Sequence, residues 1–363
     1  MKSRDGSILA LALALLAAGC AMAARNMAGE RSFDRTLRVT GPVDLDIAAS
    51  SGRIRVSAGD AGEVRIRGTI RGHDEASLLR LELNPPIEQE GNTIRVGRPI
   101  GRIEDREWLH NVSINYEVVV PPETRLHART GVGEQVVEGI RGPVDAASSS
   151  GKLTLSRIEG EVQARTGVGD IEINSVRGNV RAATSSGSIH GAGIMGSIAA
   201  RTGVGKVTLE DNAAPELDVT TSSGNVEIHG ADISGAIAAR TGVGRVTLED
   251  NAAPELEVTT SSGNVEIRGA RGAVHVRTGV GHIVAEGVIA RAWGLSTSSG
   301  NVTVRVPSQN GFDLRARTSS GRIQTGHPIT IQGAMGGQEL RGKVHGGGSL
   351  LEVRTGVGSI RIV

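Results

Sequence analysis

The chain has 363 residues, of which 52 are glycine and only 1% are aromatic, so it lacks the ring surface expected in two ordinary globular cores. Its 40 basic and 39 acidic side chains give a net charge of +1, which excludes a global field that would attract nucleic acid or anionic lipid. The apolar residues are mainly Val, Ile, Leu and Ala, which favours stacked sheet over helix.

The first segment predicts export. A basic start precedes an apolar run over residues 8–18, which is shorter than a membrane span and typical of a signal-peptide core. Because Leu-Ala-Ala-Gly-Cys at 16–20 resembles a bacterial lipobox, we predict a lipoprotein-type signal peptide over 1–20 and lipidation at Cys20. Ordinary cleavage after Ala-Met-Ala at 21–23 is the alternative. The predicted location is the cell envelope, by a lipid anchor in the outer membrane, or otherwise the periplasm or the medium.

Residues 21–40 are interpreted as a linker, and 41–127 as an N-terminal cap with irregular first coils. Ser50–Val56 and Val64–Arg67 alternate apolar and polar side chains as strands do, while His73–Arg80 is compatible with a short helix or a loop. Val112–Val120 predicts a further strand, which Pro121 ends.

Residues 128–332 contain an internal repeat of two alternating phrases, Ala-Arg-Thr-Gly-Val-Gly and Ser-Ser-Gly. The first glycine of successive phrases recurs every 16–21 residues, which predicts one coil per phrase and a repeating unit of two coils. Ala200–Ala231 recurs at Ala239–Ala270 with three differences. Such a duplication argues against a unique active site there, because a solenoid tolerates an added pair of coils.

Side chains within a coil alternate with period two, so that Val162 and Ala164 face inward while Gln163 and Arg165 face outward. Glycines mark the corners, where a tight turn requires positive φ. The predicted fold class is therefore all-β, a parallel β-solenoid with about 16–21 residues per coil, by default a right-handed single-stranded β-helix. Residues 333–363 are expected to form a glycine-rich loop and a closing coil that ends the stack.

These phrases, together with Tyr-Glu-Val-Val-Val-Pro at 116–121 and the closing Gly-Gly-Gly at 346–348, resemble the bacterial putative-adhesin family of exported β-solenoid domains of unknown function. The resemblance covers roughly residues 40–363. It implies a parallel β-helix that is often exported. It implies no catalytic residue at any position of this chain.

Catalytic and cofactor motifs are weak. Gly191–Gly196 matches the dinucleotide pattern G-x-G-x-x-G, but a β repeat follows it where that site needs a helix. The nine histidines are scattered without a Cys, Asp or Glu at metal spacing. We therefore expect no enzyme, no cofactor and no metal site.

The outward arginine before each Arg-Thr-Gly-Val-Gly corner is the candidate site. Successive arginines should lie two strands apart, about 9.6 Å at the usual strand spacing of about 4.8 Å. Such a column could bind regularly spaced carboxylates, sulfates or phosphates, and solvated packing over the corner is the alternative. Aligning Thr-Gly with Ser-Gly predicts a serine between successive arginines, at Ser149, Ser185, Ser222, Ser261, Ser298 and Ser319. The predicted column is Arg129, Arg165, Arg201, Arg240, Arg277 and Arg354.

Three functions remain open at this point. The favoured one is a non-enzymatic, adhesin-like surface that binds an envelope polymer or protein. The second is a structural spacer or filament, which would associate end to end through unpaired coil edges. The third is a carbohydrate-active β-helix enzyme.

Overall fold

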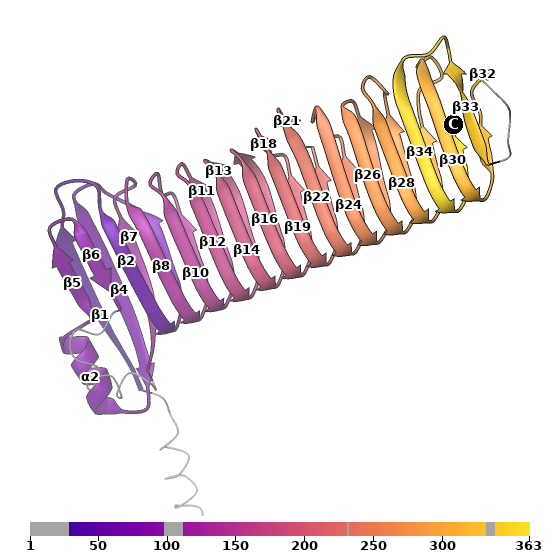
Figure 1. Ribbon diagram of the computed structural model, residues 1–363. Helices are drawn as coiled ribbons and strands as arrows, with labels where there is room; N and C mark the ends of the chain where they lie inside the picture. The colour runs from indigo at the N-terminus through magenta and orange to yellow at the C-terminus, as the bar shows by residue number, and fades with distance from the viewer. Residues whose placement is uncertain (1–28, 98–111, 231, 332–337) are drawn as a thin grey trace, which may run out of the picture.

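The computed structural model describes residues 29–97, 112–230, 232–331 and 338–363, and this part of the chain is nearly all-β. Its strands stack in parallel into an elongated solenoid that runs from the N-terminal cap to the last coils (Figure 1). The predicted fold class is thereby confirmed. Cys20 and the proposed signal peptide lie outside the described residues, and among the described helices none is long and apolar enough to cross a membrane.

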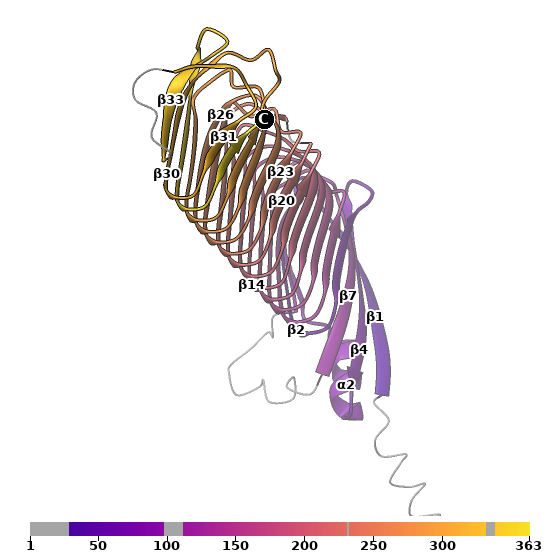
Figure 2. The same cartoon turned by 90° about the vertical axis from the view of Figure 1, so that its right-hand side faces the viewer.

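Each coil contributes one strand to each of two sheets, as the view along the stack shows (Figure 2). We call them sheet A and sheet B. The stacked strands of sheet B are β2 (Asp44–Ser51), β8 (Arg125–Val132), β10 (Val144–Ser150), β12 (Val162–Val168), β14 (Val180–Ser186), β16 (Ile198–Val204), β19 (Leu217–Ser223), β22 (Ala236–Val243), β24 (Glu255–Ser262), β26 (Ala273–Val280), β28 (Trp293–Ser299), β34 (Ser349–Val357) and β30 (Phe312–Ser320). Those of sheet A are β3 (Ile54–Ala58), β9 (Gln135–Glu138), β11 (Leu153–Ile158), β13 (Ile171–Arg177), β15 (Ile189–Met195), β17 (Val207–Glu210), β20 (Val226–His229), β23 (Val246–Glu249), β25 (Val265–Ala270), β27 (Ile283–Gly287), β29 (Val302–Arg305), β35 (Ile360–Ile362) and β31 (Ile323–Thr325), with the two-residue strands β18 (Ala213–Ala214) and β21 (Asp232–Ile233) beside them.

The predicted alternation of side chains is confirmed. Val162 and Ala164 of β12 are fully buried, and Ile171 and Ile173 of β13 pack into the same aliphatic core. From β8 to β28, residues paired between neighbouring coils are 18–20 positions apart: Val162 pairs with Val180 at 18, Ile198 with Leu217 at 19 and Leu217 with Ile237 at 20. The aliphatic column therefore continues without a break where coil length changes.

The two sheets meet at a corner occupied by one glycine in every coil. A Cβ at any of these positions would lie 1.8–2.2 Å from a backbone carbonyl oxygen of the neighbouring coil. At Gly224 the φ of +155° also disfavours any other residue. The column is Gly52, Gly133, Gly151, Gly169, Gly187, Gly205, Gly224, Gly244, Gly263, Gly281, Gly300, Gly358 and Gly321.

Buried threonines line the inside of this corner. The Thr166 hydroxyl donates to the carbonyl oxygen of Gly151 in the neighbouring coil at 3.1 Å, and Thr202 donates to that of Gly187 at 2.8 Å. A buried hydroxyl without such a partner costs about 1–3 kcal/mol. Equivalent bonds of 2.9–3.3 Å are made by Thr184, Thr221, Thr241, Thr278, Thr297, Thr355 and Thr318.

The position two residues before the glycine column alternates between serine and glycine along the stack. A Cβ at Gly131 would lie 2.4 Å from the Ser50 carbonyl oxygen, and one at Gly242 would lie 2.4 Å from that of Ser222. Since real Cβ contacts are never so short, a coil with serine here is followed by a coil with glycine. We call this the serine–glycine alternation.

The last coil does not end the stack, so that prediction was wrong. β34 pairs in parallel with β28 on one side and β30 on the other, and β35 likewise lies between β29 and β31. β28 and β30 both have serine at the alternating position, Ser298 and Ser319, and a Cβ at Gly356 would lie 2.5 Å from the Ser298 carbonyl oxygen. Gly356 between them therefore preserves the serine–glycine alternation, which direct stacking of β30 on β28 would break.

The N-terminal end is covered by antiparallel strands. β1 (Gly29–Arg38) pairs with β4 (Glu63–Gly72), which pairs with β7 (Val112–Val120), and β5 (Ile87–Glu90) with β6 (Thr93–Val96) extends sheet B. Residues 29–38 thus form a strand, which corrects the predicted linker. The helix α2 (Glu75–Leu83) lies against β1 and β4 at the lower left of Figure 1. It buries Leu78 and Leu81.

The other end has its own antiparallel cover. β33 (Glu339–Val344) pairs with β30, and β32 (Ile329–Ile331) pairs with β33. Sheet B therefore ends at both extremities in antiparallel strands that do not repeat the coil. End-to-end association stays a prediction, and it would need contacts other than the stacking of one coil on the next.

Gly224→Ala should destabilise the solenoid by about 3 kcal/mol or more, because its Cβ would clash with the backbone and its φ is strained. The matched control is Gly294→Ala, whose Cβ would meet only the exposed side chain of His275, at 3.3 Å. Thermal unfolding followed by circular dichroism measures both. Equal melting temperatures for the two variants would contradict the glycine-column argument.

Gly356→Ser should destabilise the coil formed by β34 and β35, which is inserted between β28 and β30, because a Cβ there meets the Ser298 carbonyl oxygen. Hydrogen exchange of residues 349–363 should accelerate while that of β12 stays unchanged. Val357→Ser is the control, since Val357 is exposed and its paired neighbours are the serines Ser299 and Ser320. Unchanged protection of residues 349–363 in Gly356→Ser would mean that the alternation does not determine the coil order.

Candidate ligand-binding surface on sheet B

The structure places the six predicted arginines in one column on the outward face of sheet B, and all six are exposed. One strand lies between each two that follow each other in the stack, as Ala147 lies between Arg129 and Arg165. The residues between the arginines are Ala147, Ala183, Thr220, Thr259 and Ser296. The predicted serine column was wrong by two residues, because Ser-Ser-Gly aligns with Gly-Val-Gly and not with its first glycine.

The middle of the column alternates in charge. Asp218 accepts hydrogen bonds from Arg201 at 3.1 Å and from Arg240 at 2.9 Å, and Arg240 also contacts Glu257 at 3.3 Å. Exposed ion pairs of this kind contribute about 0–1 kcal/mol each, so they order the side chains more than they stabilise the fold. The arginines here are neutralised by their own neighbours.

Two arginines nearer the N-terminal end also face carboxylates, at longer range. Arg129 lies 3.9 Å from Asp46 and Arg165 lies 3.7 Å from Asp145. Arg277 differs, because within the described ranges no carboxylate lies within 4.0 Å of it. Within the arginine column, uncompensated positive charge therefore begins at Arg277 and lies toward the C-terminal end.

At that end the column continues into an arginine cluster, defined as Arg315, Arg317, Arg341 and Arg354. Arg317 is paired in register with Arg354 on the neighbouring strand, and Arg315 is paired with Arg341 on the other side. These four side chains, with Glu339 and Glu352, line a hollow of about 280 Å³. Arg317 thus extends the predicted column by one strand.

Charge in this hollow is unbalanced. Arg341 is paired with Glu339 and Arg354 with Glu352, each at 2.6 Å. In the part of the chain that the structure describes, no ion pair joins Arg315 or Arg317 to a carboxylate within 4.0 Å. Two guanidinium groups therefore remain unneutralised beside two that are paired.

A second hollow of about 230 Å³ adjoins the first and shares Glu352 and Arg354 with it. Its other lining residues include His275, Arg277 and Leu350. Together the two hollows cross β26, β28, β34, β30 and β33. We call these two adjoining hollows, which have an excess of arginine, the sheet B groove.

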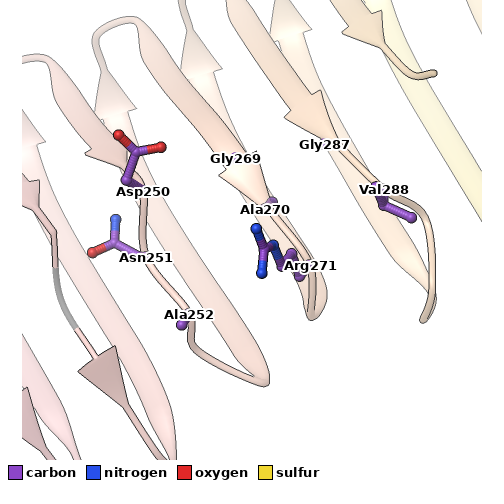
Figure 3. Close-up of a pocket in the computed structure, with 8 residues that line it drawn as sticks. All are labelled: Asp250, Asn251, Ala252, Gly269, Ala270, Arg271, Gly287 and Val288. Carbon is purple, nitrogen blue, oxygen red and sulfur yellow. The ribbon is translucent and has the colours of Figure 1, made fainter.

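A larger hollow of about 380 Å³ lies beside the ends of β23, β25 and β27. It is lined mostly by small residues, and the Asp250 carboxylate points away from the Arg271 guanidinium (Figure 3). The register shift between Ile267 and Ala270 lies next to it. Its shape is therefore explained by the local irregularity of the coils, and its polar groups do not converge on one point.

The shifted pKa values lie away from this groove. Burial raises the pKa of Tyr116, and the hydrogen bond between Lys152 and Glu172 on sheet A raises the pKa of the lysine and lowers that of the carboxyl group. Hydrogen bonds from Ser77 lower the pKa of the Asp74 carboxyl group, which caps α2. These shifts arise from burial, an ion pair and a helix cap. Over the described residues, no group of three His, Cys, Asp or Glu side chains could hold a metal ion.

Sequence reasoning missed Arg315, Arg317 and Arg341. The signal for Arg317 was present, because Arg-Thr-Ser-Ser-Gly at 317–321 combines the two phrases and shows their correct alignment directly. Arg341 had no such signal, since β33 lies outside the repeat and pairs antiparallel with β30.

Comparison with known proteins supports the resemblance seen in the sequence. Residues 192–341 match the Toastrack DUF4097 family, which confirms the resemblance for this part of the solenoid. No curated protein matches the chain significantly.

Solved structures similar to this chain include three bacterial proteins, each covering 92% of it. They are a putative cell adhesion protein from Clostridium sporogenes (12% identity, 99% of that chain, TM-score 0.21), a putative adhesin from Bacteroides fragilis (10%, 97%, 0.24) and a putative lipid binding protein from Parabacteroides distasonis (11%, 97%, 0.26). At these scores the likeness transfers no function to this chain.

Proposed function

We propose that this protein is a non-enzymatic binding protein of the bacterial cell envelope, and that it holds a linear anionic polymer against the outward face of sheet B. The observation that supports this most is the sheet B groove, because it crosses five strands and contains arginines that form no ion pair with any carboxylate of the described residues. A parallel solenoid holds such side chains in a straight line at a regular spacing, which suits an extended partner.

A role in binding explains the carboxylates of the groove as well. Glu339 and Glu352 each hold one arginine at 2.6 Å, so they orient guanidinium groups along the groove. A guanidinium group offers a planar fork of donors that matches carboxylate, sulfate or phosphate oxygens. The groove is thus suited to recognise anionic groups at its surface.

The enzyme alternative has less support. Carbohydrate-active β-helix enzymes commonly use aromatic platforms, but Trp293, Phe312 and Tyr116 are at most 1% exposed. Trp293 donates its ring N–H to the Gly272 carbonyl oxygen at 3.0 Å, which fixes it in the core beneath the groove. A spacer role is compatible with the long stack, but it leaves the excess of arginine unexplained.

The envelope location rests on the N-terminal sequence, where a basic start and an apolar core precede the lipobox-like residues 16–20. We expect Cys20→Ala to leave the protein unlipidated, so that it becomes soluble or remains unprocessed. Fractionation and mass spectrometry of the native protein measure this. An unmodified N-terminus at Ala24 would instead mean ordinary signal cleavage.

Polymer binding can be tested with Arg277→Ser, which removes the unpaired arginine of the second hollow. We expect its affinity for long polygalacturonate to fall about tenfold, since each charge-assisted contact is worth about 1.5 kcal/mol. The matched control is Arg177→Ser, an exposed arginine on sheet A. Calorimetry at low salt and at high salt, with uncharged dextran as the second ligand, measures the effect.

The expected affinity falls with salt, because exposed charges are screened. Equal affinities of Arg277→Ser and Arg177→Ser for polygalacturonate, or binding of dextran as strong as that of polygalacturonate, would contradict the proposed function.

A further inference from the structure

We infer that the arginine cluster is a binding site for a tetrahedral oxyanion, a phosphate or sulfate group. Its place on a polymer rests on the proposed function, whereas the site itself rests on the geometry of β30, β33 and β34. Four guanidinium groups from these three strands surround one hollow of about 280 Å³ that contains two carboxylates.

The cluster places like charges directly opposite each other. Arg317 faces Arg354 and Arg315 faces Arg341 on neighbouring strands, which lie about 4.8 Å apart. On their other sides Arg315 faces Glu352 and Arg317 faces Glu339, but neither of these pairs approaches within 4.0 Å. Like charges directly opposite in a sheet are unfavourable. The two carboxylates offset this only in part, because Glu339 already pairs with Arg341 and Glu352 with Arg354. An anion beside Arg315 and Arg317 would supply the charge that is missing.

The contrast with the regular coils strengthens this inference. In three other Ser-Ser-Gly coils the position equivalent to Arg315 is a carboxylate, Asp145, Asp218 or Glu257, and each of these lies within 4.0 Å of a column arginine. In β30 arginine replaces that carboxylate, and Arg317 occupies the place where those coils have Ala147, Thr220 and Thr259. β14 also has an arginine at this position, Arg181, but it pairs with Glu161. Among the described coils, the terminal Ser-Ser-Gly coil thus differs in having two cations on this face, neither of them in an ion pair.

The number and arrangement of donors favour a tetrahedral anion over a single carboxylate. Arg315 and Arg317 are two residues apart on one face of β30, about 6.6 Å along the strand, and their strand neighbours approach from both sides. A planar carboxylate matches one guanidinium fork, whereas phosphate or sulfate offers oxygens in several directions. Two unneutralised guanidinium groups also match the charge of a dianion.

The inserted coil is part of this site. β34 supplies Arg354 and Glu352, and it reaches β30 only because it lies between β28 and β30. With β30 stacked directly on β28, Arg317 would lie beside Ser296 and the hollow would lose one of its four arginines. The oxyanion site therefore depends on the order of the coils.

The test uses the full chain and inorganic phosphate or sulfate as the probe. Calorimetry with wild type should show binding that the double variant Arg315→Ser/Arg317→Ser weakens at least about tenfold. Arg177→Ser/Arg245→Ser removes the same charge from exposed arginines outside the groove and should stay within about twofold of wild type. Equal phosphate and sulfate binding by the cluster variant and wild type would overturn the inference.

The pH dependence of binding distinguishes a phosphate ester from a sulfate ester. The second pKa of a phosphate monoester is about 6, so its affinity should rise between pH 5.5 and 7.5, whereas that of a sulfate ester should not. Phosphorylated and sulfated dextrans distinguish the two groups on a polymer. If Arg277→Ser binds polygalacturonate as wild type does while the cluster still binds inorganic phosphate or sulfate, the proposed function fails and the oxyanion site stands.

Discussion

The close approach of stacked corners is the constraint on which the rest of this structure depends. Each corner glycine brings its carbonyl oxygen so near the next coil that no Cβ fits. In nine of the described coils a buried threonine of that next coil donates to the same oxygen, as Thr166 does to Gly151. The glycine carbonyl oxygen thus leaves no room for a side chain on the next coil. It also accepts a hydrogen bond from a threonine hydroxyl that would otherwise have no partner in the aliphatic core. The repeated pairing of glycine and threonine allows the coils to stack with a constant register while the other connections vary in length.

The same closeness determines the order of the coils. Because a Cβ two residues before the corner would meet a serine carbonyl oxygen, a coil with serine must be followed in the stack by a coil with glycine. Between β28 and β30, which both have serine, only a coil of the other kind fits, and β34 with Gly356 occupies that place. The steric rule at Gly356 thereby also determines that Arg354, two residues earlier on β34, lies beside Arg317. The candidate site is in this sense a consequence of backbone packing.

Charge along sheet B is distributed unevenly although the chain is almost neutral. In the middle of the stack Asp218 and Glu257 neutralise the column arginines, so that this stretch is a polar surface without a net attraction for anions. On β30 arginine takes the position of Asp218 and Glu257, and the face gains positive charge. A binding surface localised at one end agrees with a long solenoid whose regular part supports and orients that end.

The sequence alone determined the features that depend on local pattern: parallel coils, the inward face of Val162 and Ala164, the corner glycines and the outward arginines, because side-chain parity and positive φ are properties of neighbouring residues. Residues 317–321 also contained the correct alignment of the two phrases, but aligning the phrases by their first glycine obscured it. Only the tertiary structure decided that β34 lies between β28 and β30, that β33 adds Arg341 antiparallel to β30, and that residues 29–38 form a strand. These depend on contacts between segments far apart in the chain, such as Gly356 with Ser298, and no local pattern expresses the 2.5 Å approach that selects them.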